Sequence, residues 1–135
     1  MPDPTRWLRY AAALYAVGLV LHTADHLRRG IDVITPAVLW AGNLSTALGI
    51  LTIGLVVAHH RLAPLFAALT GIPIAVGVAA VHLLPSWGAL SDSFLDTHGL
   101  GVTAFSWTVV LIEIVGAFAM GVAGIVIVKE RAVAT

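Results

Sequence analysis

Long apolar segments separated by polar links make up most of the chain. Four segments carry enough apolar residues to cross about 30 Å of hydrocarbon, which takes roughly 20 residues of α-helix. They cover residues 7–26, 37–58, 62–84 and 104–128. Inside a bilayer each segment must be helical, because every backbone polar group then needs a partner within the segment. The pattern predicts an all-α integral membrane protein, a four-helix transmembrane bundle that forms a single domain over residues 1–135.

The composition agrees with a membrane protein and argues against several other classes. Only 10% of the 135 residues are charged, and 59% are hydrophobic. Water-soluble domains usually carry about 25% charged residues, so the chain has too few charges to cover a soluble globule. The net charge is zero and no basic patch alternates with aromatic residues, which argues against a nucleic-acid partner. Cysteine is absent, which excludes disulfides and thiolate metal sites.

The distribution of lysine and arginine predicts the orientation in the membrane. Five such residues fall on one side of the four spans and two on the other, and cytoplasmic links carry the excess. Both termini are therefore expected on the cytoplasmic side of the cell membrane, with the longer link, residues 85–103, outside. Arg28 and Arg29 are the two exceptions to the rule. We expect them to pair with Asp25, with Asp32, with the acidic outer loop or with an anionic head group.

Each predicted helix contributes at least one polar residue from its outer half. Counted at about 1.5 Å of rise per residue, His22, Asn43, His82 and Glu113 all lie within the outer leaflet. Small residues such as glycine and alanine share the helix faces of His82 and Glu113, and such faces are where membrane helices approach closely. A carboxylate such as that of Glu113 is costly inside a membrane and usually has a function. The four polar residues are therefore expected to converge inside the bundle.

The chemistry of this group predicts a metal site. His22 and His26 are four residues apart, so both imidazoles can bind one metal ion from a single helix face. With His82 and Glu113 as further ligands, the site would offer three imidazoles and one carboxylate. That donor set suits a transition metal ion such as zinc, iron or copper.

Other polar residues are expected around the ligands. Asp25 would orient a histidine from behind or bind the metal itself, and Asn43 would lie beside the site or hydrogen-bond between helices. In the outer loop, Asp92, Asp96 and His98 are polar residues that would cap the site or simply face solvent.

Three functional hypotheses remain open at this level. The first is a metal site that acts on a lipid-like small molecule, because the site would open to the outer leaflet, with metal-activated water or oxygen as the natural chemistry. The second is a structural or accessory subunit of a membrane complex or homo-oligomer, in which the polar residues only set the helix register. The third is an electron carrier that holds haem b between His22, or His26, and His82. The sequence does not decide whether the protein is an enzyme.

Overall fold

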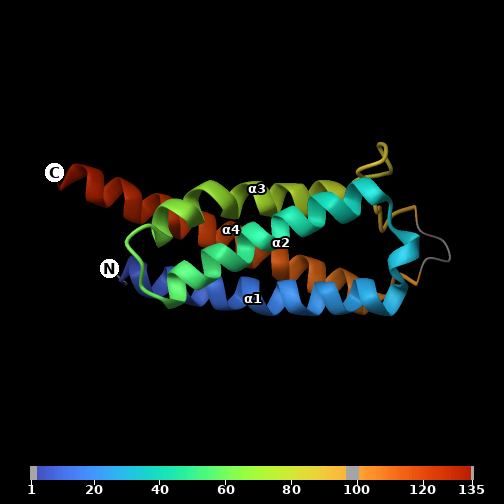
Figure 1. Ribbon diagram of the computed structural model, residues 1–135, viewed down its shortest axis with the longest axis horizontal. Coiled ribbons are helices and arrows are strands. Elements are labelled where there is room, and N and C mark those ends of the chain that lie inside the picture. Colours follow the sequence, from blue (N-terminus) through green and yellow to red (C-terminus); the bar gives the residue numbers. More distant parts are fainter. Residues whose placement is uncertain (1–2, 97–100, 135) are drawn as a thin grey trace.

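The computed structural model describes residues 3–96 and 101–134 and contains four long helices that run along one axis (Figure 1). They are α1 (Pro4–Arg29), α2 (Pro36–Val57), α3 (Ala63–Leu83) and α4 (Ala104–Val133), with a short 3-10 turn η1 (Ile31–Val33) after α1. The first helix begins and the last one ends at the same end of the bundle. The four predicted helices are confirmed.

The ends of the helices differ from the prediction for local reasons. The first helix begins at Pro4 because the Asp3 side chain caps it by accepting a hydrogen bond from the Thr5 amide, and proline fits the first turn. It continues to Arg29 and ends at Gly30, whose φ of 96° favours glycine. At its C-terminal end α4 continues beyond the predicted span to Val133, because charged residues such as Lys129 and Glu130 do not end a helix.

Within the described residues, α2, α3 and α4 are long and apolar enough to cross a membrane. The first helix is long enough but carries Arg6, Arg9 and the polar stretch 22–29, and it falls short of the same hydropathy. The structure is therefore consistent with a helical membrane bundle. The placement of both termini in the cytoplasm stays a prediction from the charge distribution.

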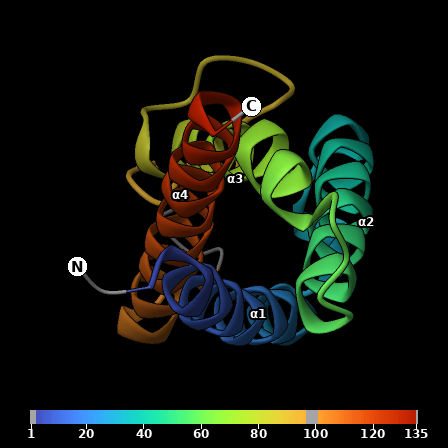
Figure 2. The same cartoon turned by 90° about the vertical axis from the view of Figure 1, so that its left-hand side faces the viewer.

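The helices do not pack equally tightly. Helix α4 packs along both α1 and α3, whereas α2 makes far fewer contacts and lies across the bundle from α4 (Figure 2). Of the 22 residues of α2, the buried ones are Val38, Gly49, Thr52 and Val56. The hydroxyls of Thr52 and Thr70 lie 3.0 Å apart and connect α2 to α3. The loose packing of α2 leaves room between the helices at the outer end.

Glycines set the distance between α4 and its two neighbours. A Cβ atom at Gly18 would lie 2.5 Å from the Cα of Glu113, and one at Gly71 would lie 2.5 Å from the amide nitrogen of Gly121. No side chain fits at such distances, so the backbones of α1 and α4, and of α3 and α4, are in direct contact. Small residues allow this close approach between membrane helices, as the sequence predicted. The contact at Gly18 holds Glu113 one turn below His22.

Replacing Gly18 with leucine should separate α1 from α4. The new side chain would meet the backbone of Glu113, which cannot move aside as a flexible side chain would. We expect a loss of about 1–3 kcal/mol in the free energy of unfolding, the usual cost of overpacking. Unfolding by titration with a denaturing detergent measures it. Gly54→Leu is the matched control, because a Cβ at Gly54 meets nothing within 4 Å; equal losses in both variants would contradict the prediction.

Candidate metal centre

The C-terminal end of α1 places four polar side chains on one face. His22, Asp25 and Arg29 are buried and His26 is partly buried, whereas the intervening Thr23 is exposed. This burial follows the spacing of residues three, four and seven apart that defines one side of a helix. The predicted shared face is confirmed, and its side chains contact α3 and α4.

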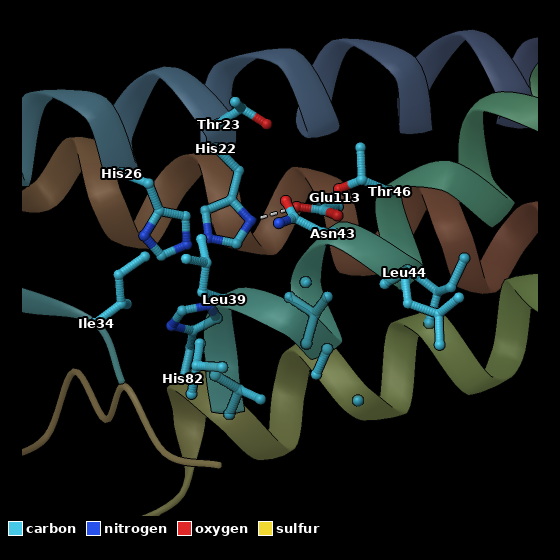
Figure 3. A pocket seen from close by; sticks show the side chains of 18 of the residues that line it. His22, Thr23, His26, Ile34, Leu39, Asn43, Leu44, Thr46, His82 and Glu113 are labelled. Carbon is cyan, nitrogen blue, oxygen red and sulfur yellow. Dashed lines mark hydrogen bonds and ion pairs between the residues drawn. The ribbon is translucent and has the colours of Figure 1, made fainter. Parts of the chain in front are cut away.

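His82, in the last turn of α3, completes a cluster of three imidazoles. The ring centroid of His22 lies 4.6 Å from that of His26 and 4.8 Å from that of His82, and the third pair is 5.6 Å apart. One nitrogen from each ring can be chosen so that all three lie within 4.8 Å of one another. Figure 3 shows the rings gathered between the two helices. This grouping of His22, His26 and His82 could hold a metal ion.

Glu113 reaches the cluster through His22. Its Oε2 atom forms a short hydrogen bond with Nδ1 of His22, drawn as a dashed line in Figure 3. The other ring nitrogen of His22, Nε2, is buried and has no hydrogen-bond partner within the described residues. The sequence placed Glu113 among the ligands. The structure places it behind His22, where a carboxylate fixes the orientation of a ring and leaves the opposite nitrogen for a ligand.

The loop between α3 and α4 contributes Asp92, which contacts both His82 and His26. Its backbone carbonyl lies 3.0 Å from Nδ1 of His82, and its Oδ2 atom lies 3.5 Å from the same nitrogen and 3.9 Å from Nδ1 of His26. The Asp92 carbonyl therefore fixes the ring of His82 through its Nδ1 atom, as the Glu113 carboxylate fixes the ring of His22. The sequence named Asp92 only as one of three possible cap residues. Its position depends on the path of the loop, which no helical periodicity could indicate.

Arg29 anchors this loop to the end of α1. Its guanidinium donates two hydrogen bonds to the Asp92 carboxylate, at 2.8 and 2.7 Å, and lies 5.2 Å from the centre of the Phe94 ring. Burial raises the pKa of Asp92, but the hydrogen bonds and charge of Arg29 outweigh it, so the pKa lies below its usual value. The carboxylate is thus ionised at neutral pH. The expectation that Arg29 pairs with the acidic outer loop is confirmed.

Phe94 is a contact residue that sequence reasoning missed. Its ring packs against His82, with centroids 4.7 Å apart, and against Trp107 at 5.5 Å. An aromatic residue in a polar loop gives no sequence signal for such a role. Of the other two cap candidates, Asp96 is exposed and accepts a hydrogen bond from the Ser86 amide, and His98 lies outside the described residues.

Asp25 pairs with Arg28, one of the partners expected for that arginine, and Asn43 lies beside the cluster. Asp25 is fully buried, and its Oδ1 atom accepts two hydrogen bonds from Arg28, at 3.0 and 2.8 Å. Arg28 also donates to the Gly101 carbonyl at 2.6 Å and to the Ser106 hydroxyl at 3.2 Å, so this pair joins α1 to the start of α4. Within the described residues Asp25 makes no hydrogen bond to a histidine. Asn43 is exposed on α2 and lines a cavity beside the cluster.

That cavity has a volume of about 610 Å³ and lies between α1, α2 and α3. The three histidines and Glu113 form its polar end, and the remaining wall is mostly apolar side chains of α2 and α3 (Figure 3). Its size falls in the range of about 300–1,000 Å³ typical of pockets for small molecules. A metal ion bound by the three imidazoles would therefore face an accessible, largely apolar space.

The arrangement of the rings does not favour a haem held by two histidines. Two axial imidazoles must lie on opposite faces of a porphyrin, with the macrocycle between them. The rings of His22 and His82 meet edge to face at 4.8 Å between centroids, and those of His26 and His82 are 5.6 Å apart. These rings contact one another directly, so no macrocycle fits between them as they stand.

Comparisons with protein-family models, with curated proteins and with solved structures found no match to this chain. The functional argument therefore depends on the geometry of the site and on general chemistry.

Proposed function

We propose that this protein is a membrane protein that binds one transition metal ion through His22, His26 and His82. The observation that carries the proposal is a cluster of three imidazoles, two of them buried, whose ligand nitrogens lie within 4.8 Å of one another. Nε2 of His22 is buried and has no hydrogen-bond partner within the described residues. Leaving such an atom unpaired costs about 1–3 kcal/mol, which a bound metal would recover.

The contacts behind the rings support the same proposal. Histidines that bind metals usually engage their other nitrogen with a carboxylate or a backbone carbonyl. His22 has Glu113 at that position, and His82 has the carbonyl of Asp92. Tetrahedral zinc with bonds of 2.0–2.1 Å requires ligand nitrogens about 3.3 Å apart. Binding would therefore draw the three rings together by somewhat more than 1 Å, a movement that side-chain rotation can supply.

Three protein ligands leave one coordination position open. Closed sites with four protein ligands are typical of structural metals, whereas three histidines and an open position are typical of catalytic zinc. The imidazole donors suit zinc, iron or copper. A metal ion held here would supply a Lewis acid and an acidified water molecule at the polar end of the cavity. The protein itself would hold the rings, exclude bulk water and direct the open position toward the apolar space.

A second function, a structural subunit, is supported by the ion pairs around the cluster. Arg29–Asp92 and Arg28–Asp25 fix the ends of the helices to one another without any metal. Such pairs would hold the helix register for a partner protein equally well. The two functions differ in whether the histidines are needed for anything besides packing.

Metal content distinguishes the two functions. The purified protein in detergent should retain one zinc, iron or copper ion per chain after exchange into metal-free buffer, as measured by inductively coupled plasma mass spectrometry. His22→Ala and His82→Ala should lose the ion, because each removes one of three ligands. His60→Ala is the matched control, since His60 is exposed in the link between α2 and α3 at the other end of the bundle. A folded wild-type protein that binds no added metal would overturn the proposal and leave the structural function.

A further inference from the structure

We propose that the cavity binds a single-tailed carboxylate, the chemistry of a fatty acid, with its carboxylate on the open position of the metal ion and its tail beside α2. The inference rests on the proposed metal site and names the ligand that would take the fourth position. It follows from the charges around a bound ion, from the covered end of the cavity and from the space beside α2.

A divalent ion at the three histidines would leave one positive charge in excess. Arg28 and Asp25 form an ion pair of 2.8 Å, so their two charges cancel. Arg29 and Asp92 cancel in the same way at 2.7 Å. The histidine ligands are neutral imidazoles, so the carboxylate of Glu113, which accepts its hydrogen bond from one of them, offsets one of the two charges of the ion. A monoanion at the open position would make the site neutral, and an uncompensated charge in an apolar space is costly.

The cavity wall leaves the metal ion as the positive group that an anionic head would meet. The lining residues in the described part of the chain include no lysine or arginine. The three histidines would each use one nitrogen for the ion, so the second oxygen of a bound carboxylate needs a different hydrogen-bond donor. Asn43 and Thr46 line the same cavity from α2 (Figure 3), and an amide N–H or a hydroxyl can donate to that oxygen. The site therefore offers a carboxylate one metal bond and a separate hydrogen-bond donor.

The histidine end of the cavity is covered by the links that follow α1 and α3. Ile34 of the first link and Trp87 and Leu90 of the second line the cavity. The Thr35 hydroxyl donates a short hydrogen bond to the Ala89 carbonyl and joins the two links. A carboxylate ends its molecule and needs no room beyond the metal ion, whereas the phosphate of a phospholipid carries groups on both sides. The covered end therefore favours a single-tailed carboxylate over a phospholipid.

The loose packing of α2 provides the space for the tail. Apolar side chains such as Leu48 of α2 and Ile74 of α3 line the cavity away from the histidines. Ile74 precedes His82 by eight residues, which is about 12 Å along the axis of α3. Gly42 of α2 and Gly77 of α3 are also in the wall, and a Cβ atom added at either would meet nothing within 4 Å. A hydrocarbon tail in this space buries no polar group and gains contacts with both helices.

Cobalt-loaded protein in nanodiscs of phosphatidylcholine tests the inference, because the visible bands of cobalt respond to a new oxygen ligand. Titration with dodecanoate should change these bands and saturate. Two further probes separate the head from the tail: 1-dodecanol has the same tail with a neutral head, and acetate has the same head without a tail. Both should require at least tenfold more ligand to produce the same change. Nanodiscs that contain phosphatidylglycerol should give the same spectrum as those of phosphatidylcholine alone.

The opposite results would overturn the inference. If 1-dodecanol binds as well as dodecanoate, the argument from charge is wrong, and if acetate binds as well, the tail contributes nothing. If phosphatidylglycerol changes the bands as dodecanoate does, the covered end does not exclude a phospholipid. If cobalt binds stoichiometrically and dodecanoate has no effect, this inference fails while the metal site stands; if no cobalt binds, both fail.

Two glycine variants locate the tail. Gly42→Leu and Gly77→Leu should place a side chain in the cavity and weaken dodecanoate binding at least tenfold, while acetate binding and the cobalt content of one ion per chain stay unchanged. Gly54→Leu is the matched control: Gly54 also lies on α2 with nothing within 4 Å of an added Cβ, but it is outside the cavity wall. It should bind dodecanoate as the wild type does. Unchanged dodecanoate binding in Gly77→Leu would show that the tail lies elsewhere.

Discussion

Arg29→Met should lower the free energy of unfolding by about 3–5 kcal/mol, because it leaves the buried carboxylate of Asp92 without its partner. The side chain of Arg29 is fully buried and that of Asp92 is 2% exposed, so water cannot replace the lost hydrogen bonds. The pair also joins the loop between α3 and α4 to the end of α1, next to the histidines. Unfolding by titration with a denaturing detergent, followed by circular dichroism, measures the loss.

The double variant Arg29→Met/Asp92→Leu separates the cost of the unpaired charge from the loss of the loop contact. Removing both charges of a buried pair is often neutral or stabilising, because neither charge then has to leave water. We expect the double variant to recover most of the stability that Arg29→Met loses. Arg131→Met is the control, since Arg131 is exposed and its contact is one hydrogen bond of 2.9 Å to the Arg61 carbonyl. A double variant no more stable than Arg29→Met would show that the pair acts through the position of the loop.

The sequence predicted the helices and the inward polar faces because both depend on local periodicity. Apolar segments of about 20 residues have few alternatives to a helix in a membrane. The spacing of His22, Asp25, His26 and Arg29 determines a shared face whatever the rest of the fold does. Depth along each helix then brought His82 to the same level. These inferences needed only the rise and the turn of an ideal helix.

The sequence could not predict which atoms meet at the site. Depth along the helices groups Glu113 with the histidines, but the contact between Gly18 and the backbone of Glu113 decides that it faces His22. Asp92 reaches the cluster through a loop whose path depends on its pairing with Arg29. Both contacts are tertiary: His22 and Glu113 are 91 positions apart in the chain, and Arg29 and Asp92 are 63 positions apart. Helical periodicity carries no information about them.

The cavity is the feature furthest from any sequence pattern. Apolar residues on α2 look the same in sequence whether they pack against a neighbouring helix or stand away from it. Helix α2 is separated from much of α1 and α3 and makes few contacts with either. One of its contacts with α3 is the pair of hydroxyls at Thr52 and Thr70. The empty space at Gly42 and Gly77 is a consequence of that geometry.

Glu113→Gln should weaken metal binding by about 10- to 100-fold, the usual effect of removing a carboxylate behind a metal-binding histidine. The glutamine amide has the same shape and can still accept a hydrogen bond from Nδ1 of His22. It lacks the negative charge that makes the opposite nitrogen a stronger donor to a cation. Competition with a chromophoric chelator in detergent measures the affinity for zinc in the variant and in the wild type.

A role in positioning His22 for a metal can be distinguished from a role in packing. If Glu113 acts on the metal through His22, the metal-free variant should unfold at nearly the same detergent concentration as the metal-free wild type, and only the metal-loaded forms should differ. Glu130→Gln is the matched control, because Glu130 lies on the same helix at the opposite, exposed end. It should leave the affinity for zinc unchanged. A large loss of stability in metal-free Glu113→Gln with unaltered affinity would instead assign Glu113 to the attachment of α4 to α1.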